Sequence, residues 1–362
     1  MQVKAAVTLG YQQPFVIKDV EVAPPGKDEI LVKIVATGVC HTDAVMRDNP
    51  GVVPMPAILG HEGAGIVASV GEAVSGIRVG DHVVLSYAAC HDCENCLSNH
   101  PSACEDFNTL NFGGRRGDGT TPYRLGDQDL SLFFGQSSFS QYVVTRASNA
   151  VVVDPEVDLT LLGPLGCGIQ TGSGTVLNRL KPVVGESLVV FGCGAVGLSA
   201  IMAAKLTGCS QIIAVDIHAS RLALAGELGA THQINGKEQD AVAVIKQITG
   251  KGAHYAVETT GVSAIVLQAV HAVKPLGTVA IVGFTGDITL NVQNDLMAEG
   301  KSLVGVIEGD AVPALFIPRL VQLYKQGKFP IDKLIARYPL ADINQAFADS
   351  ASGKVIKPVV VM

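Results

Sequence analysis

The sequence has no run of lysine or arginine and little charge of either sign. Charged residues make up 16% of the 362 residues, and the formal net charge is −7. Binding to nucleic acid needs a concentrated basic surface, so this composition argues against a nucleic-acid partner. An anionic cofactor can still bind at a local site.

Long apolar runs are also scarce. The most membrane-like segment, Leu188 to Ala204, is short for a membrane span and contains three glycines. We expect a buried strand that runs into a helix there, and no association with a membrane. Because the first ten residues show no signal-peptide pattern, we expect a cytoplasmic protein. The eight cysteines then lie in a reducing compartment, where clustered thiols bind metal more often than they form disulfides.

Two different patterns divide the chain. Up to about residue 160, short runs such as Ile30 to Ala36 and Gly65 to Val70 predict strands bounded by turns. From Ser187, strands alternate with helices, which predicts an α/β fold with a doubly wound parallel sheet. We expect strands at Ser187–Phe191, Gln211–Asp216, His254–Glu258, Thr278–Val282 and Ser302–Val306, and helices at Val196–Leu206 and Ser220–Leu228.

The tail, from about Glu308, returns to mixed structure and ends with a predicted strand at Val359–Val361. We therefore expect three segments: residues 1–168 form a β-rich domain, residues 169–307 the doubly wound domain, and residues 308–362 a return to the first domain. No internal repeat or low-complexity linker interrupts this plan.

A glycine fingerprint follows the strand Ser187–Phe191. Gly192 permits a tight turn, Gly194 lets the backbone approach a pyrophosphate, and Gly197 lets the following helix pack closely against the sheet. Asp216, at the end of the next strand, can accept hydrogen bonds from ribose hydroxyls and would repel a 2′-phosphate. The pattern therefore indicates NAD rather than NADP. A structural glycine turn with a helix-capping aspartate is the alternative.

Four cysteines lie close together in a segment with few apolar residues: Cys90, Cys93, Cys96 and Cys104. Four thiolates at this spacing suit a closed, tetrahedral structural zinc site. Metal would also supply folding energy that this segment cannot obtain from burial. Disulfides or reduced surface thiols are the alternative. A zinc ribbon that binds nucleic acid would need two separated knuckles and a basic surface, and both are missing.

Three more residues are candidate metal ligands: Cys40, His61 and Cys167. Taken singly, each reads as a buried thiol or a core histidine, and spacing alone does not join them. The whole chain, however, resembles the zinc-containing medium-chain alcohol dehydrogenases. The resemblance rests on Gly60-His61-Glu62, the four-cysteine segment and the fingerprint with Asp216, in that family's order. It implies a GroES-like catalytic domain beside a Rossmann domain, with two zinc ions and NAD for each chain.

The resemblance assigns roles to residues around the catalytic zinc. Cys40, His61 and Cys167 would be its ligands, with Glu62 behind the metal as an occasional ligand and Asp43 as the partner of His61. Thr42 would relay the proton from the alcohol. Many family members carry a histidine three positions later as the final base, and this chain has Val45 there. His41 is adjacent and is our candidate for that base, besides a contact with the pyrophosphate.

The remaining assignments concern cofactor and substrate. The resemblance places Thr171 near the nicotinamide, Arg221 near the adenosine ribose and Lys357 at the pyrophosphate. The substrate pocket would include Ser86, Phe133, Phe134, Phe284 and Ile307. Small residues at Ser86 and Gly51 leave room for a bulky substrate, and aromatic walls favour a ring. The chain looks most like the bacterial aryl-alcohol (benzyl alcohol) dehydrogenases of this family.

These features predict oxidation of a primary, benzyl-type alcohol to its aldehyde with hydride transfer to NAD. Within the same superfamily, a glutathione-dependent formaldehyde dehydrogenase or a general aliphatic alcohol dehydrogenase is the alternative. A non-enzymatic, cofactor-binding structural protein is the alternative from another class, but it would not need Cys40, His61 and Cys167 together. The resemblance also implies a homo-oligomer, and we expect a tetramer rather than a dimer.

Overall fold

Three β-sheets organise the chain, two in one unit and one in the other. The computed structural model describes residues 1–362. Unit 1 comprises Met1–Cys167 with Val312–Met362, and unit 2 comprises Gly168–Ala311. None of the helices is both long and apolar enough to span a lipid bilayer.

Unit 1 contains a five-stranded and a seven-stranded sheet. The first has the order β4-β1-β2-β7-β8; the second has the order β10-β6-β5-β3-β18-β17, with β9 also paired to β3. The strands are β1 (Gln2–Thr8), β2 (Val16–Val22), β3 (Glu29–Gly38), β4 (Ala57–Ile58), β5 (Gly63–Val70), β6 (His82–Leu85), β7 (Tyr123–Leu125), β8 (Gln128–Leu130), β9 (Tyr142–Arg146), β10 (Ala150–Val152), β17 (Ile335–Pro339) and β18 (Lys357–Val361).

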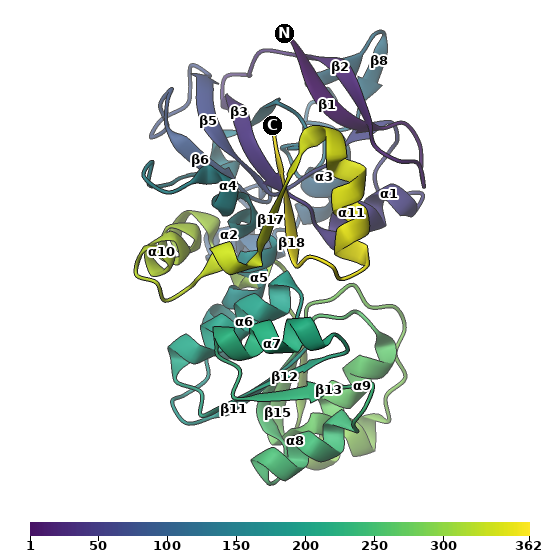
Figure 1. The fold of residues 1–362 in the computed structure, drawn as a ribbon. Helices are drawn as coiled ribbons and strands as arrows, with labels where there is room; N and C mark the ends of the chain where they lie inside the picture. The colour runs from purple at the N-terminus through teal and green to yellow at the C-terminus, as the bar shows by residue number, and fades with distance from the viewer. The chain divides into compact units, whose positions relative to one another are not determined.

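The last strand of the chain pairs with an early one. β18 runs antiparallel to β3, with Val359 opposite Gly38 and Val361 opposite Ala36. Helix α11 packs beside β18, as Figure 1 shows in yellow. The helices of unit 1 are α1 (His41–Asp48), α2 (Glu94–Leu97), α3 (Phe107–Phe112), α4 (Leu159–Leu162), α10 (Pro313–Lys325) and α11 (Ile343–Ala351).

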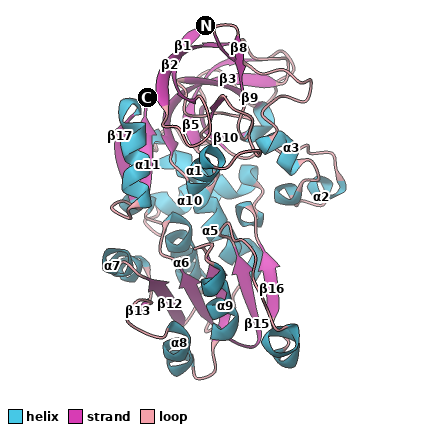
Figure 2. Ribbon diagram, turned by 90° about the vertical axis from the view of Figure 1, so that its right-hand side faces the viewer, coloured by secondary structure: helices cyan, strands magenta, loops and turns pink.

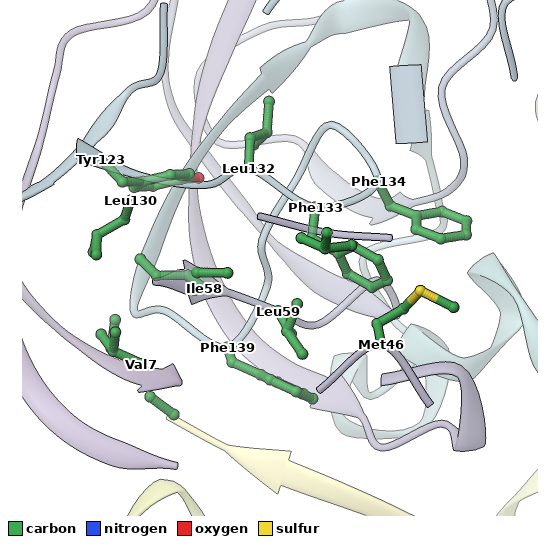
Figure 3. Packing of buried hydrophobic residues seen from close by; sticks show 14 of the residues in the cluster. Val7, Met46, Ile58, Leu59, Tyr123, Leu130, Leu132, Phe133, Phe134 and Phe139 are labelled. Carbon is green, nitrogen blue, oxygen red and sulfur yellow. The ribbon is translucent and has the colours of Figure 1, made fainter. Parts of the chain in front are cut away.

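A large apolar core fills unit 1. Its members come from both sheets and from the segments between them, and they include Met46 on α1 together with Phe133 and Phe134 (Figure 3). Burial of such side chains stabilises a fold by about 1.5–3 kcal/mol each. The core therefore fixes the position of α1, which begins directly after Cys40.

Unit 2 is built on six parallel strands in the order β13-β12-β11-β14-β15-β16. This is the strand order of a dinucleotide-binding sheet. Figure 2 shows the strands in magenta with helices at both sides. The elements are α5 (Gly168–Gly174), β11 (Ser187–Phe191), α6 (Ala195–Thr207), β12 (Gln211–Asp216), α7 (Ala219–Leu228), β13 (His232–Asn235), α8 (Ala241–Thr249), β14 (Ala253–Glu258), α9 (Ser263–Ala272), β15 (Val273–Ile281) and β16 (Ser302–Gly305).

The predicted α/β fold class is confirmed, and β11 and β12 have the predicted bounds. The segment Leu188 to Ala204 is a strand that leads into α6, as expected. β13 was not predicted from the sequence, because its residues are mostly polar and it is an edge strand. The four-cysteine segment, which has few apolar residues, contains the short helix α2.

Candidate active site and metal centres

Cys40, His61 and Cys167 meet in unit 1 although they are far apart in sequence. Cys40 is the residue before α1, and His61 lies between β4 and β5. Cys167 is the last residue of Met1–Cys167, the first of the two segments that form unit 1. Their ligand atoms and a Glu62 carboxylate oxygen all lie within 4.8 Å of one another. The fold therefore gathers two thiols, one imidazole and one carboxylate at a single point.

The His61 ring is oriented for a ligand. Its Nδ1 lies 2.9 Å from Asp43 Oδ1, which also accepts a hydrogen bond from Gly60 N at 3.0 Å. Its Nε2 is buried and has no hydrogen-bond partner. A buried polar atom without a partner is costly, and a metal ion would satisfy it. Two sulfurs and one imidazole nitrogen fit zinc with an open fourth position.

The electrostatics of this site favour a cation. A hydrogen bond with Cys167 lowers the pKa of Cys40 well below its usual value, although burial by itself would raise it. Burial by itself lowers the pKa of His61, but the Asp43 carboxylate and the Cys40 thiolate raise that pKa overall. Cysteine binds metal as the thiolate, so its neighbours prepare Cys40 for that role.

Lys357 lies behind this site and forms an ion pair with Glu62. Its Nζ donates to both carboxylate oxygens of Glu62 and to Val39 O. Burial raises the pKa of Glu62, and Lys357 opposes that rise. Lys357 thus contacts three acceptor atoms inside unit 1. The pyrophosphate contact expected from the sequence remains a prediction.

Phe133 and Phe134 flank the His61 ring. The Phe134 ring stacks on the imidazole with centroids 4.6 Å apart, and the Phe133 ring meets it edge-on at 5.4 Å. Both phenylalanines are buried members of the core. Ser86 is buried too, and its Oγ donates to Gly166 O at 2.7 Å. The substrate-lining role expected for these three residues remains a prediction.

A buried glutamine was not anticipated from the sequence. Gln136 follows the two phenylalanines, is fully buried, and bonds to the backbone of His61, Gly63 and Ser86. It stands in a run of glycine and serines that reads as a surface turn. Only its tertiary contacts distinguish it.

The relay candidates lie at the start of α1. Thr42 Oγ1 is 3.6 Å from Cys40 Sγ, and Thr42 is half-buried. His41 is exposed, whereas Val45 is half-buried and packs against the apolar core. The hydroxyl of Thr42 thus borders the metal site, and Val45 provides no proton acceptor there.

The four-cysteine cluster forms a second centre in unit 1. The sulfur atoms of all four residues lie within 4.8 Å of one another, and none forms a disulfide. Cys90 Sγ and Cys96 Sγ are 3.8 Å apart, a separation that suits two thiolates around one zinc ion. Four thiolates would occupy all four positions of a tetrahedral metal ion, so a metal held here has no open position for substrate.

Unit 2 carries the glycine fingerprint at the end of β11. Gly192 has a φ of 91°, which a glycine adopts without strain. A Cβ on Gly197 would lie 1.8 Å from Gly192 O, so only glycine permits this helix to approach the turn. A Cβ on Gly194 would meet no atom within 4 Å, which leaves space over the backbone at that position.

Asp216 is held at the end of β12 by backbone amides. Its Oδ2 accepts from Cys193 N at 2.7 Å, and its Oδ1 accepts from Ile217 N and His218 N at 2.7 and 2.8 Å. Oδ1 already accepts two hydrogen bonds, whereas Oδ2 accepts one, so Oδ2 can still receive a ribose hydroxyl. These bonds fix the carboxylate beside the fingerprint before any cofactor arrives.

The other expected contacts in unit 2 are left as predictions. Arg221, on α7, has a buried Nε without a hydrogen-bond partner. Thr171 is 8% exposed within α5. Phe284 and Ile307 are 57% and 55% exposed in unit 2.

Comparisons with known proteins agree with these two units. The chain matches the family model of the alcohol dehydrogenase GroES-like domain over residues 26–155 and that of the zinc-binding dehydrogenases over residues 195–325. A geraniol dehydrogenase from Castellaniella defragrans is 44% identical over 366 residues, which cover 99% of this chain and 97% of the relative.

Two solved structures match the whole chain. An alcohol dehydrogenase zinc-binding domain protein from Burkholderia ambifaria is 50% identical, with a TM-score of 0.97 and coverage of 100% of this chain and 99% of its own. The benzyl alcohol dehydrogenase from Acinetobacter calcoaceticus is 47% identical, with a TM-score of 0.96 and the same coverage. The chain therefore belongs to the zinc-containing medium-chain alcohol dehydrogenases, enzymes that use zinc and a nicotinamide cofactor.

Proposed function

We propose that this chain oxidises primary alcohols, by preference aromatic ones of the benzyl type, to aldehydes with hydride transfer to NAD. The observation that carries the proposal is the convergence of Cys40, His61 and Cys167 in unit 1, where the buried Nε2 of His61 has no hydrogen-bond partner. When bound there, zinc supplies a Lewis acid that lowers the pKa of an alcohol, and NAD supplies a hydride acceptor.

The chain's own residues perform the remaining tasks. Asp43 holds the His61 tautomer that leaves Nε2 free to bind metal. Thr42 accepts the proton of the alcohol at its Oγ1 and passes it toward solvent, with His41 as the terminal base. Phe133 and Phe134 keep water away from the His61 ring. Water exclusion strengthens the electrostatic interactions inside the site.

Specificity for a ring is supported by two features of unit 1. Phe133 and Phe134 form an aromatic surface beside the proposed metal ligand, and aromatic rings favour one another by stacking or edge contacts. Ser86 is a small residue whose hydroxyl is turned to Gly166 O, so it takes up little room in the pocket we propose. The similarity to a benzyl alcohol dehydrogenase points the same way.

Geraniol is the second candidate substrate, because a geraniol dehydrogenase is among the similar relatives. Values of kcat/KM for benzyl alcohol, geraniol, ethanol and the hydroxymethyl adduct of glutathione separate the candidates. We expect benzyl alcohol to give the highest value and ethanol a much lower one. A preference for ethanol or for the glutathione adduct would overturn the aromatic assignment.

NAD is the proposed cofactor, with Asp216 as the residue that selects it over NADP. Asp216 is 7% exposed and carries a negative charge beside the fingerprint, where a 2′-phosphate would be repelled. Thr171 and Arg221 are proposed to contact the nicotinamide and the adenosine ribose.

We also propose that the chain assembles as a homo-tetramer. β16 is an edge strand of the unit 2 sheet, and unpaired strand edges invite pairing with another chain. Exposed apolar side chains occur in the sequence around it, namely Val292, Met297 and Ile307. The molar mass measured by light scattering tests the proposal, since a monomer or a dimer contradicts it.

A further inference from the structure

The side chain of Gln136 spans three backbone segments of unit 1. Its Nε2 donates to His61 O at 3.1 Å and to Ser86 O at 3.3 Å, and its Oε1 accepts from Gly63 N at 3.2 Å. One amide group thus forms hydrogen bonds with His61 and Gly63, the two neighbours of Glu62 in sequence. It also bonds to Ser86, which directly follows β6. All three bonds lie in the interior, because Gln136 is fully buried.

The backbone of Gln136 is anchored as firmly as its side chain. Gln136 N donates to Phe133 O at 3.0 Å, and Tyr123 Oη donates to Gln136 O at 3.0 Å. Tyr123 is itself fully buried. The turn that supplies the rings against His61 therefore also supplies the amide that holds the His61 backbone.

The contacts of this turn fix His61 from two directions. Phe133 and Phe134 limit the tilt of the imidazole, and Asp43 limits its rotation. Gln136 limits movement of the peptide that carries the ring. A shift of that backbone would move the ligand nitrogen relative to Cys40 and Cys167 even if the ring kept its rotamer.

We propose that Gln136 is a positioning residue for the catalytic metal site. It holds the backbone of His61, Glu62 and Gly63 at a fixed position relative to the backbone of Ser86. This inference rests on the proposed function for its kinetic consequence only. Groups that support metal ligands through hydrogen bonds typically change metal affinity or activity by about 10- to 100-fold when removed.

Asn111 offers a matched control. It is a second buried amide in unit 1, and it also makes three hydrogen bonds to the backbone: Oδ1 accepts from Ala88 N, while Nδ2 donates to Ala88 O and Phe107 O. Its side chain forms no hydrogen bond with His61, Glu62 or Ser86, and the bond from Phe134 N to its backbone O does not involve the amide that is replaced. Loss of its amide removes as many buried bonds without releasing the His61 backbone.

The experiment compares Gln136→Met with Asn111→Leu, two replacements of similar shape that cannot form these bonds. Purified protein is loaded with Co²⁺ in place of zinc at both sites, and its visible absorption is compared between variants. Since the four-cysteine site is the same in all of them, a spectral difference reports a change of ligand geometry at the Cys40, His61 and Cys167 site. Melting temperature is measured on the same samples, and kcat and KM for benzyl alcohol are measured on the zinc forms.

We expect both variants to have a lower melting temperature than the wild type. Only Gln136→Met should alter the cobalt spectrum and lower kcat, by about 10- to 100-fold. Gln136→Glu keeps the acceptor for Gly63 N while losing the donors to His61 and Ser86, so it should show the same spectral change if Gln136→Met does not fold. Equal effects of Gln136→Met and Asn111→Leu, or an unchanged cobalt spectrum in the Gln136 variants, would overturn the proposal. The spectrum decides the question even if benzyl alcohol is not a substrate.

Discussion

Lys357 holds Glu62 by both carboxylate oxygens, with Nζ 2.9 Å from Oε1 and 3.0 Å from Oε2. The side chains are 5% and 0% exposed. Removing one partner of a buried pair leaves the other charge uncompensated, which typically costs about 3–5 kcal/mol. This ion pair therefore ties the last strand of the chain to the backbone of the metal site.

Replacing Lys357 should destabilise unit 1 strongly. We expect Lys357→Met to lower the free energy of unfolding by about 3–5 kcal/mol, measured by urea denaturation with zinc present. Lys354→Met is the control, because Lys354 pairs with Asp349 and its side chain is 68% exposed; it should lose far less. Equal decreases in the free energy of unfolding of the two variants would show that the buried Lys357–Glu62 pair stabilises the fold no more than an exposed ion pair does.

The same variant should respond to pH. Lys357 opposes the rise that burial causes in the pKa of Glu62, so its removal raises that pKa further. An acid whose folded-state pKa is above its unfolded value destabilises the fold at high pH, and this penalty disappears as pH falls below the unfolded value. The deficit of Lys357→Met should therefore be smaller at pH 6 than at pH 8.

Thr42 should be required for proton transfer. Its hydroxyl borders the metal site, and general acid–base groups contribute about 100-fold or more to rate. We expect Thr42→Val to lower kcat for alcohol oxidation about 100-fold, whereas Thr42→Ser keeps most of it because the hydroxyl remains. Turnover of Thr42→Val close to that of the wild type would rule out the relay.

His41 is the candidate base that takes the place of the histidine missing at Val45. It is exposed at the start of α1, where a proton can leave to solvent. We expect His41→Ala to raise the Kd for NAD and to shift the pH–rate profile of kcat. If the Kd rises while the profile stays the same, His41 binds cofactor but is not the base.

Asp216 should determine the choice of cofactor. Loss of a charged hydrogen-bond acceptor costs about 1.5–3 kcal/mol, which corresponds to at least about tenfold in affinity. We expect Asp216→Asn to lower kcat/KM for NAD about tenfold and to allow measurable use of NADP. Glu227→Gln, an exposed charge change on α7, should leave both values near those of the wild type.

Much of the fold could be predicted because local patterns determine it. The strand Ser187–Phe191, the glycine turn and the strand that ends at Asp216 form one continuous local signal, and β11 and β12 have the predicted bounds. β13 could not be predicted, because its hydrogen bonds with β12 stabilise a sequence that has little strand propensity of its own.

The candidate site could be predicted only in part. The four-cysteine cluster follows from spacing, since its ligands are neighbours in sequence. Cys40, His61 and Cys167 needed the family resemblance, because only the tertiary fold brings them within 4.8 Å. Gln136 and the partners of Lys357 had no sequence signal, since an amide or an ammonium shows its role only through the backbone atoms it meets.

The two metal centres are the central claim, and the zinc content of one variant tests it most directly. Cys167→Ser removes a ligand from the open site and leaves Cys90, Cys93, Cys96 and Cys104 intact. Mass spectrometry of the purified proteins should give two zinc ions per chain in the wild type and one in Cys167→Ser, with loss of alcohol-dependent NAD reduction in the variant. A wild-type chain that binds one zinc ion, or a Cys167→Ser chain that keeps two and remains active, would contradict the account.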